Sequence, residues 1–365
     1  MADARAHVAR ARRVVVKIGS STLSADAGVF ARLAEALAAR REGRSFVVVS
    51  SGAIAIGMKK LGYRARPKEM AKLQASAAAG QSLLMRAYEE AFAARGMAVA
   101  QVLLTHADLA DRTRGNNARA ALAALLEAGA VPILNENDSV AVDEIKFGDN
   151  DQLAAMVAPL VDADLVVLLS DVEGLLDGHG RRIPLVRDVA TEALPHVRAP
   201  SGSGGAGSGG MGSKVEAARR ATLAGANVVV ADAREPGTIE AVLAGEDVGT
   251  LFVAAPDRLS ARKYWIAFTL RPRGDIVLDH GAAAAVRAKG KSVLAVGVLG
   301  VRGDFRAGDA VRLVDAGGGE IARGLARCGA ADAALVAGKT REDLPAERAD
   351  LAVLVHADDL VIGGH

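Results

Sequence analysis

Two lysines lie beside runs of small residues, an arrangement suited to binding phosphate. Lys17 lies near the end of the apolar run VVVKIG and is followed by Gly19 and two serines. Lys214 closes the stretch SGSGGAGSGGMGSK, residues 201–214, and opens a segment with helical periodicity. The free N–H groups at a helix N-terminus attract anions, and a lysine adds a mobile positive charge. We therefore expect residues 201–214 to form a phosphate-binding loop, with a mobile surface loop as the alternative.

The same stretch has the composition of a flexible Gly/Ser linker between two domains. However, the apolar run ANVVVAD follows at 226–232, so the stretch lies inside a region of alternating strands and helices and does not join two domains. It is not a Walker A motif either, because that motif places Lys before Ser or Thr, and here Ser213 precedes Lys214. The sequence thus excludes the P-loop kinases and GTPases.

Amide and carboxylate side chains crowd together after the apolar run that ends in LNEND. The group consists of Asn135, Asn137, Asp138, Asp149, Asn150 and Asp151. Turn formation and helix capping account for some of these residues. Oxygen acceptors beside a strand end also suit a substrate ammonium group, a pair of lysines or Mg²⁺. Further polar residues follow two other apolar runs, namely Ser51 in VVVSSG and Ser170 and Asp171 in LLSD.

The apolar runs are the strands that must position these side chains. They lie at residues 13–19, 45–52, 97–105, 130–138, 164–171 and 226–232. Continuous apolar runs suit strands that are buried on both faces of a mostly parallel sheet. Helical patterns occupy the gaps at about 28–42, 69–95, 116–128, 150–160 and 213–225. The alternation predicts an α/β domain over residues 1–255, a mostly parallel sheet sandwiched by helices, with ligands at the carboxyl ends of its strands.

Two further segments complete the predicted organisation. The alternating stretch SVAVDEIKFGDND, residues 139–151, predicts a small hairpin beside the sheet. After a connector at 256–274, residues 275–365 have short strands, frequent glycines and one convincing helix at about 281–289. Regular turn signals between short strands predict a small β-rich barrel or sandwich.

Composition narrows the classes of function. The net charge of +2 gives no strong field to recruit nucleic acid or membrane. Arginines precede the first apolar run, but Lys17 interrupts that run too early for a secretory signal, and no stretch is long enough to span a bilayer. The single Cys328 fits a reducing compartment, so we expect a cytoplasmic protein. The histidines show no metal-ligand spacing and no G-x-S-x-G motif occurs, so we assign no protein metal site and no acyl-serine chemistry.

The ordered set VVVKIGSS, VVVSSGAIAIG, PILNENDSV, EIKFGDND, LLSDVEGL and SGGMGSK resembles the bacterial glutamate 5-kinase family, which has the amino acid kinase fold. The resemblance covers about residues 12–255. The C-terminal part, including GDIVLDHGAAAAV, is similar to the PUA module that many members append. The longer tract GSGGAGSGG before MGSK departs from the family pattern.

The resemblance implies ATP-dependent phosphorylation of the side-chain carboxylate of L-glutamate, the first step of proline biosynthesis. It implies that Lys17 and Lys214 neutralise charge on the transferring phosphoryl group and that Asp151 holds the two lysines. Glutamate would be held by Ser51, Asp138 and Asn150. The nucleotide site would be lined by Lys17, Ser170, Asp171, Ser208, Gly209, Gly210, Met211, Gly212, Ser213 and Lys214.

Cofactors and partners follow from the same chemistry and the same resemblance. ATP phosphates carry more charge than two lysines neutralise, so we expect Mg²⁺ with ATP. The resemblance also implies a homo-oligomer and feedback inhibition by proline.

Two alternatives remain. One is a kinase of the same fold that acts on N-acetylglutamate, aspartate, carbamate or a nucleoside monophosphate, although NENDSV and IKFGDND favour free glutamate. The other is an RNA-binding PUA protein. Residues 275–355 mix acids with bases, and Phe305 is their only aromatic residue, so we do not expect nucleic acid as the main partner.

Overall fold

The computed structural model describes residues 2–26, 28–141, 150–197 and 210–363. The chain forms two compact units, Met1–Arg258 and Leu259–His365. Residues 256–274, expected to connect two domains, are divided between these units and hold α12 (Ala261–Tyr264) and the π-helical turn η4 (Trp265–Thr269). Within the described residues, no helix is both long enough and apolar enough to cross a bilayer.

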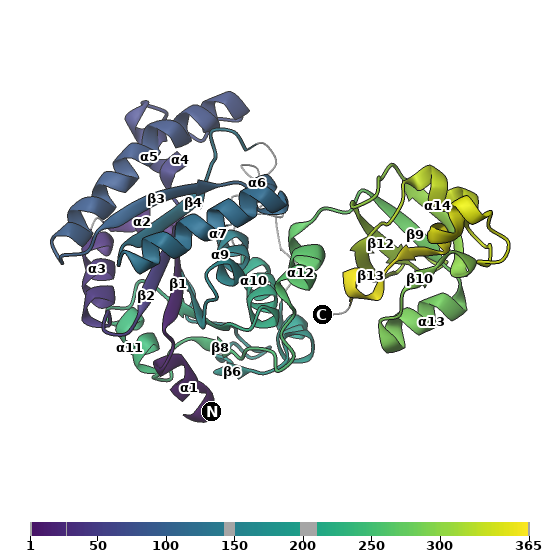
Figure 1. The fold of residues 1–365 in the computed structure, drawn as a ribbon. Coiled ribbons are helices and arrows are strands. Elements are labelled where there is room, and N and C mark those ends of the chain that lie inside the picture. Colours follow the sequence, from purple (N-terminus) through teal and green to yellow (C-terminus); the bar gives the residue numbers. More distant parts are fainter. Residues whose placement is uncertain (1, 27, 142–149, 198–209, 364–365) are drawn as a thin grey trace. The chain divides into compact units, whose positions relative to one another are not determined.

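The first unit is built on an eight-stranded sheet (Figure 1). Its strands are β1 (Arg13–Ile18), β2 (Ser45–Ser50), β3 (Val99–Leu104), β4 (Val131–Glu136), β5 (Leu165–Ser170), β6 (Leu185–Val186), β7 (Asn227–Asp232) and β8 (Thr250–Phe252). The order across the sheet is β3-β4-β2-β1-β5-β7-β8-β6, and only the β7–β8 pair is antiparallel. The chain moves from β1 to β2 on one side and later returns to β5 on the other. This switch point at β1 is where open parallel sheets bind ligands.

Helices cover both faces of this sheet (Figure 1). They are α1 (Ala2–Ala9), α2 (Ser20–Ala25), α3 (Val29–Ala39), α4 (Ala53–Lys60), α5 (Met70–Ala93), α6 (His106–Ala110), α7 (Arg112–Glu127), α9 (Asn150–Val157), α10 (Met211–Leu223) and α11 (Thr238–Ala244). Short helical turns lie at η1 (Ala158–Leu160), η2 (Val189–Ala193) and η3 (Leu194–His196). The architecture confirms the predicted mostly parallel sheet sandwiched by helices.

The alternation of residues along a strand decides which helices each side chain meets. In β1, Val14 and Val16 pack with α3, α5 and α11, whereas Val15 packs with α7, α9 and α10. By the same alternation Lys17 shares the face of Val15. In β2 and β4, Ser50 and Asn135 share the opposite face, which α5 covers. The polar residues at the strand ends therefore reach two different helical layers.

The helices α4 and α5 pack unusually closely through a pair of glycines. A Cβ atom added at Gly57 would lie 1.7 Å from the carbonyl oxygen of Ser76, and one added at Gly80 would lie 1.8 Å from that of Ala53. Backbone therefore meets backbone at this crossing, and no side chain fits between the two helices. Since α4 begins directly after Ser51 and Gly52, this contact fixes α5 relative to the end of β2.

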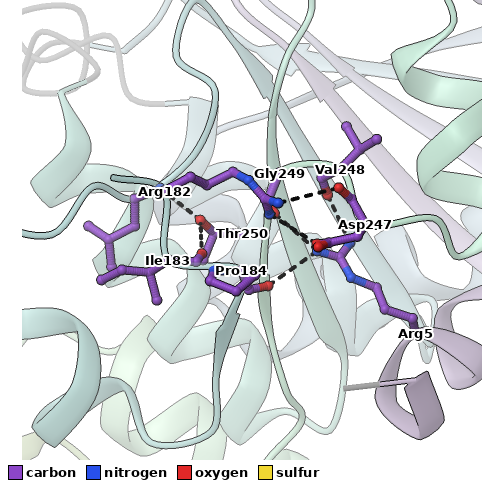
Figure 2. A network of polar contacts seen from close by, with 9 residues as sticks. Arg5, Arg182, Ile183, Pro184, Asp247, Val248, Gly249 and Thr250 are labelled. Atoms are coloured by element: carbon purple, nitrogen blue, oxygen red, sulfur yellow. Dashed lines mark hydrogen bonds and ion pairs between the residues drawn. The ribbon is translucent and has the colours of Figure 1, made fainter. Parts of the chain in front are cut away.

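The β8–β6 edge of the sheet is held by a buried guanidinium from the N-terminal helix (Figure 2). Arg5 in α1 donates hydrogen bonds of 2.8–3.2 Å to three carbonyl oxygens, those of Pro184, Val248 and Gly249. It also pairs with Asp247 at 3.3 Å, and Arg182 pairs with the same carboxylate at 3.1 Å. The hydrogen bond from Arg182 lowers the pKa of Asp247, so this carboxylate stays ionised. The network therefore holds the starts of β6 and β8 together at this edge of the sheet.

The second unit holds a five-stranded sheet in the order β11-β9-β12-β13-β15 and a separate β10–β14 pair. The strands are β9 (Gly274–Leu278), β10 (Val293–Leu294), β11 (Val298–Gly303), β12 (Ala310–Val314), β13 (Glu320–Leu325), β14 (Val353–Val355) and β15 (Leu360–Ile362). Its helices are α13 (His280–Lys289) and α14 (Ala330–Val336), with short turns η5 (Ala295–Gly297), η6 (Ala346–Ala352) and η7 (Ala357–Asp359). The predicted β-rich character and the helix near 281–289 are confirmed.

Short elements were not predicted. The six apolar runs all form strands, but β6 and β8 have only two and three residues. The helices α1, α4, α6, α11 and α14 are also too short for periodicity to identify. The hairpin expected at 139–151 falls mostly on residues 142–149, which lie outside the described residues.

Replacing Gly57 with alanine should destabilise the first unit. The added methyl group collides with backbone, which cannot turn away as a side chain can, so the free energy of unfolding should fall by about 1–3 kcal/mol or more. Gly178→Ala is the control, because nothing lies within 4 Å of a Cβ there. Chemical denaturation monitored by circular dichroism measures both variants. Equal stability of Gly57→Ala and the control would show that the helices separate freely at this crossing.

Candidate active site

Two lysines meet one carboxylate near the carboxyl end of β1. Lys17 Nζ lies 2.6 Å from Asp151 Oδ1, and Lys214 Nζ lies 3.3 Å from Asp151 Oδ2. The three side chains are 8%, 4% and 0% exposed for Lys17, Lys214 and Asp151, respectively. We call these residues the lysine cluster. Because buried like charges repel strongly at low dielectric, holding two ammonium groups together requires the shared carboxylate.

Local structure explains how the three residues meet. Lys17 lies on the face of β1 that α9 and α10 cover, Asp151 is the second residue of α9, and Lys214 lies in the first turn of α10. The side chain of Gln152 donates a 3.1 Å hydrogen bond to the carbonyl oxygen of Ser213, which ties the two helix starts together. A buried lysine at the positive end of a helix is unfavourable by itself. The carboxylate of Asp151 offsets this cost in the structure.

The glycine after Lys17 leaves room beside the ammonium group. A Cβ atom at Gly19 would lie 3.7 Å from Lys17 Nζ and 3.8 Å from Ser21 Oγ. Glycine thus places no side chain against the ammonium group of Lys17 at this strand end.

Amide groups converge beside the end of β2. Asn150 Nδ2 lies 2.9 Å from the carbonyl oxygen of Ser50, 2.7 Å from Ser51 Oγ and 3.2 Å from Asn135 Oδ1. Asn150 precedes Asp151, so the first two residues of α9 join this amide group to the lysine cluster. Two of the predicted acceptor-site residues, Ser51 and Asn150, are thus in direct contact.

Asp138 follows the end of β4 and is partly buried. Burial raises the pKa of Asp138 to about 6, and the positive charge of Arg66 opposes this shift. A carboxylate with a raised pKa is one that lacks full solvation or a strong partner. Such a group is suited to pairing with a cation that arrives with a ligand.

The predicted nucleotide-binding residues lie at the ends of β5 and at the start of α10. Ser170 is buried, and its hydroxyl donates a 3.1 Å hydrogen bond to the exposed carboxylate of Asp171. Gly210 is the N-cap of α10 and has no side chain to satisfy the free N–H groups of the first turn. Met211, Gly212 and Ser213 form that turn together with Lys214. Ser208 and Gly209, and also Asp149, lie outside the described residues.

Two residues that the sequence did not single out contact this region from α5. The side chain of Gln81 accepts a 2.9 Å hydrogen bond from Asn135, and the hydroxyl of Tyr88 donates one of 2.9 Å to Ser50 Oγ. Their spacing of seven residues, two helical turns on one side of α5, is the signal in the sequence that links them.

Comparison with known proteins gives two family matches. Residues 12–232 match the amino acid kinase family, and residues 274–346 match the PUA domain. The chain is 49% identical to the glutamate 5-kinase of Myxococcus xanthus over 96% of each chain. It is 46% identical to the glutamate 5-kinase of Ralstonia nicotianae over 98% of this chain and 99% of that one. It is 45% identical to that of Chromobacterium violaceum over 96% and 97%, respectively.

These likenesses extend over nearly the whole chain, and the matched region contains every element that builds the lysine cluster. The chain therefore belongs to the glutamate 5-kinase family, with an amino acid kinase domain and a PUA domain.

Proposed function

We propose that this chain transfers the γ-phosphoryl group of ATP to the side-chain carboxylate of L-glutamate, giving L-glutamyl 5-phosphate and ADP, the first step of proline biosynthesis. The single observation that supports this most strongly is the lysine cluster, where two buried ammonium groups are held together at the switch point of the sheet. The names of the relatives point to glutamate as the acceptor.

The reaction needs positioning and charge neutralisation rather than a covalent enzyme intermediate. An oxygen of the glutamate side chain attacks the γ-phosphorus, a new O–P bond forms, and the bond to the ADP oxygen breaks. Lys17 and Lys214 donate to the phosphoryl oxygens as negative charge spreads over them. Asp151 orients both lysines and keeps them from separating in the ligand-free protein.

The amino acid would lie beside the end of β2. The hydroxyl of Ser51, which accepts from Asn150 at 2.7 Å, would donate to a carboxylate of the amino acid, and Asp138 together with the Oδ1 of Asn150 would accept from its ammonium group. The nucleotide would lie over Ser170, Asp171 and residues 208–214, with its phosphates at the start of α10.

Mg²⁺ is proposed as the companion of ATP. The exposed carboxylate of Asp171 and the phosphates themselves are oxygen donors of the kind that Mg²⁺ prefers. When bound, the ion would neutralise phosphate charge beyond what two lysines supply.

A homo-oligomer and inhibition by proline are proposed from the family resemblance, and a cytoplasmic location is proposed from the single Cys328. Light scattering of the purified chain tests the first, where a monomer at working concentration would contradict it. Initial rates with millimolar proline test the second, where unchanged kinetics would contradict it.

The acceptor is identified by a panel of substrates. We expect ADP release, measured by a coupled assay with Mg²⁺-ATP, to depend on L-glutamate. N-acetylglutamate, aspartate, carbamate and a nucleoside monophosphate should support little turnover. Turnover with one of these substrates but not with glutamate would overturn the proposal.

Replacing Lys214 or Lys17 with alanine should lower kcat by about 10²–10³-fold, with a smaller change in the KM for glutamate. Each variant loses one preorganised donor to the charge that develops in the transition state. Lys59→Ala is the control, because this lysine is exposed on α4. If Lys214→Ala kept the kcat of the control, the glycine-rich segment would be a surface loop and not a phosphate site.

Asp138 should give the glutamate kcat/KM an acid limb near pH 6. Only the ionised carboxylate attracts the substrate ammonium group, so kcat/KM should fall as the pH drops through the pKa of about 6. Asp138→Asn should abolish this limb and raise the KM for glutamate strongly, while the KM for ATP stays nearly constant. Glu127→Gln, an exposed carboxylate elsewhere, is the control.

The free energy of unfolding of Asp138→Asn distinguishes a loss of glutamate binding from misfolding. The pKa of Asp138 is raised in the folded protein, so its ionised form costs stability that accumulates as pH rises from about 4, the unfolded value, to about 6. Asp138→Asn should therefore be at least as stable as the parent at pH 8. A large loss of stability, with both KM values changed, would contradict a binding role.

A further inference from the structure

The helix α5 sends two polar side chains toward the strand ends that form the amino-acid site. Gln81 and Tyr88 are seven residues apart, which is two helical turns, so they lie on the same face. Gln81 reaches Asn135 at the end of β4, and Tyr88 reaches Ser50 at the end of β2. Neither side chain belongs to the lysine cluster.

Backbone groups fix the orientation of every amide in this network. The N–H of Glu136 donates to Asn135 Oδ1 at 2.9 Å, so the Nδ2 of Asn135 must face Gln81. The carbonyl oxygen of Ser50 accepts from Asn150 Nδ2 at 2.9 Å, so the Nδ2 of Asn150 must face β2. Since a backbone N–H only donates and a carbonyl only accepts, these two contacts leave no alternative amide flip.

Gln81 consequently presents its oxygen, and not its nitrogen, to Asn135. Asn135 in turn accepts from Asn150 at 3.2 Å, and Asn150 contacts Ser51 Oγ at 2.7 Å. A continuous series of hydrogen bonds thus runs from α5 through β4 to the proposed substrate ligands. The hydrogen bonds that connect Gln81 with Asn150 and Ser51 pass through Asn135.

Tyr88 supports the other end of the network. Its hydroxyl donates to Ser50 Oγ at 2.9 Å, and Ser50 Oγ donates to the carbonyl oxygen of Ser51 at 3.2 Å. The ring packs edge-on against Phe30 and Phe92, with centroids 4.9 and 6.0 Å away. Burial raises the pKa of Tyr88, so the hydroxyl stays protonated and remains a donor.

Two atoms of the network are costly to the folded protein. Gln81 Nε2 and Asn150 Oδ1 are buried and have no hydrogen-bond partner among the described residues. An unsatisfied buried donor or acceptor costs about 1–3 kcal/mol. An apolar residue of the same size at position 81 would remove the unpaired Nε2, but it would also take away the acceptor for the buried Nδ2 of Asn135, so the two effects on stability oppose each other.

The backbone of α5 cannot shift to accommodate a different side chain. Gly80 packs directly against the carbonyl oxygen of Ala53 in α4, and Gln81 is the next residue. Since α4 starts just after Ser51, the same helix pair positions both Ser51 and Gln81. The distance from Gln81 to Asn135 is therefore set by the fold.

We propose that Gln81 and Tyr88 are positioning residues for the amino-acid acceptor: they hold Asn135, Asn150 and Ser51 in the orientation that binds it. This inference rests on the proposed function, because it takes Ser51 and Asn150 as substrate ligands. Gln81 acts through Asn135, and Tyr88 acts through Ser50. Neither touches the reacting atoms.

The test compares Gln81→Met and Tyr88→Phe with the parent enzyme and with Glu89→Met, an exposed position on the same helix. Gln81→Met should raise the KM for glutamate about tenfold or more, with the KM for ATP within about twofold of the parent and only a small change in melting temperature, because the variant removes one unpaired buried atom and creates another. Tyr88→Phe should raise the KM for glutamate by a few-fold in the same selective way. Glu89→Met should match the parent.

A conservative variant and a double-mutant cycle test the route of the effect. Gln81→Glu keeps an oxygen acceptor for Asn135. Its KM for glutamate should therefore be lower than that of Gln81→Met. In an Asn135→Ala background, Gln81→Met should change the KM for glutamate by less than about twofold, because the side chain that connects Gln81 to Asn150 is already missing. If the double variant instead shows the product of the two single-variant changes in the KM for glutamate, Gln81 does not act through Asn135.

The remaining outcomes separate this inference from the proposed function. If the parent enzyme uses another acceptor of the panel, glutamate is wrong, and the same comparison is made with that acceptor. If the parent enzyme uses glutamate but Gln81→Met keeps the parent KM, the positioning role is wrong. A lowered melting temperature with equal loss of all kinetic parameters would mean that Gln81 is structural only.

Discussion

One buried carboxylate determines how the active-site region can be built. Asp151 contacts Lys17 at 2.6 Å and Lys214 at 3.3 Å, and these lysines come from opposite ends of the first unit's sequence. Two ammonium groups this close repel each other, and burial makes the repulsion stronger. The carboxylate offsets this repulsion before any ligand is bound. The lysines are then oriented in advance for a phosphoryl group, which is how preorganised charge contributes most to catalysis.

Helices on both faces of the sheet bring side chains to this region. One face of the sheet meets α9 and α10, which bring Asp151 and Lys214 to Lys17. The other face meets α5, which contacts Asn135 and Ser50. Asn150 connects the two layers, because it lies next to Asp151 in α9 and bonds to both strand ends on the α5 side. The proposed phosphoryl site and amino-acid site are thus parts of one hydrogen-bonded structure.

Much of this was predictable from the sequence, for physical reasons. Continuous apolar runs identified the six long strands, and their common direction put Lys17 and the polar residues near one edge. The pairing of Asp151 with both lysines was expected only from the family resemblance, since spacing along the chain does not show which helix faces which strand. Gln81 and Tyr88 were not identified, because on an amphipathic helix they occupy ordinary inward positions. The raised pKa of Asp138 depends on burial, which no local pattern of residues reveals.

The most direct measurement is a crystal structure with ADP, Mg²⁺, aluminium fluoride and L-glutamate, in which the fluoride group mimics the transferring phosphoryl group. The account predicts that Lys17 Nζ and Lys214 Nζ both lie within hydrogen-bond distance of that group while Asp151 still contacts both lysines. A fluoride group bound away from either lysine, or a cluster that separates when the ligands bind, would contradict it.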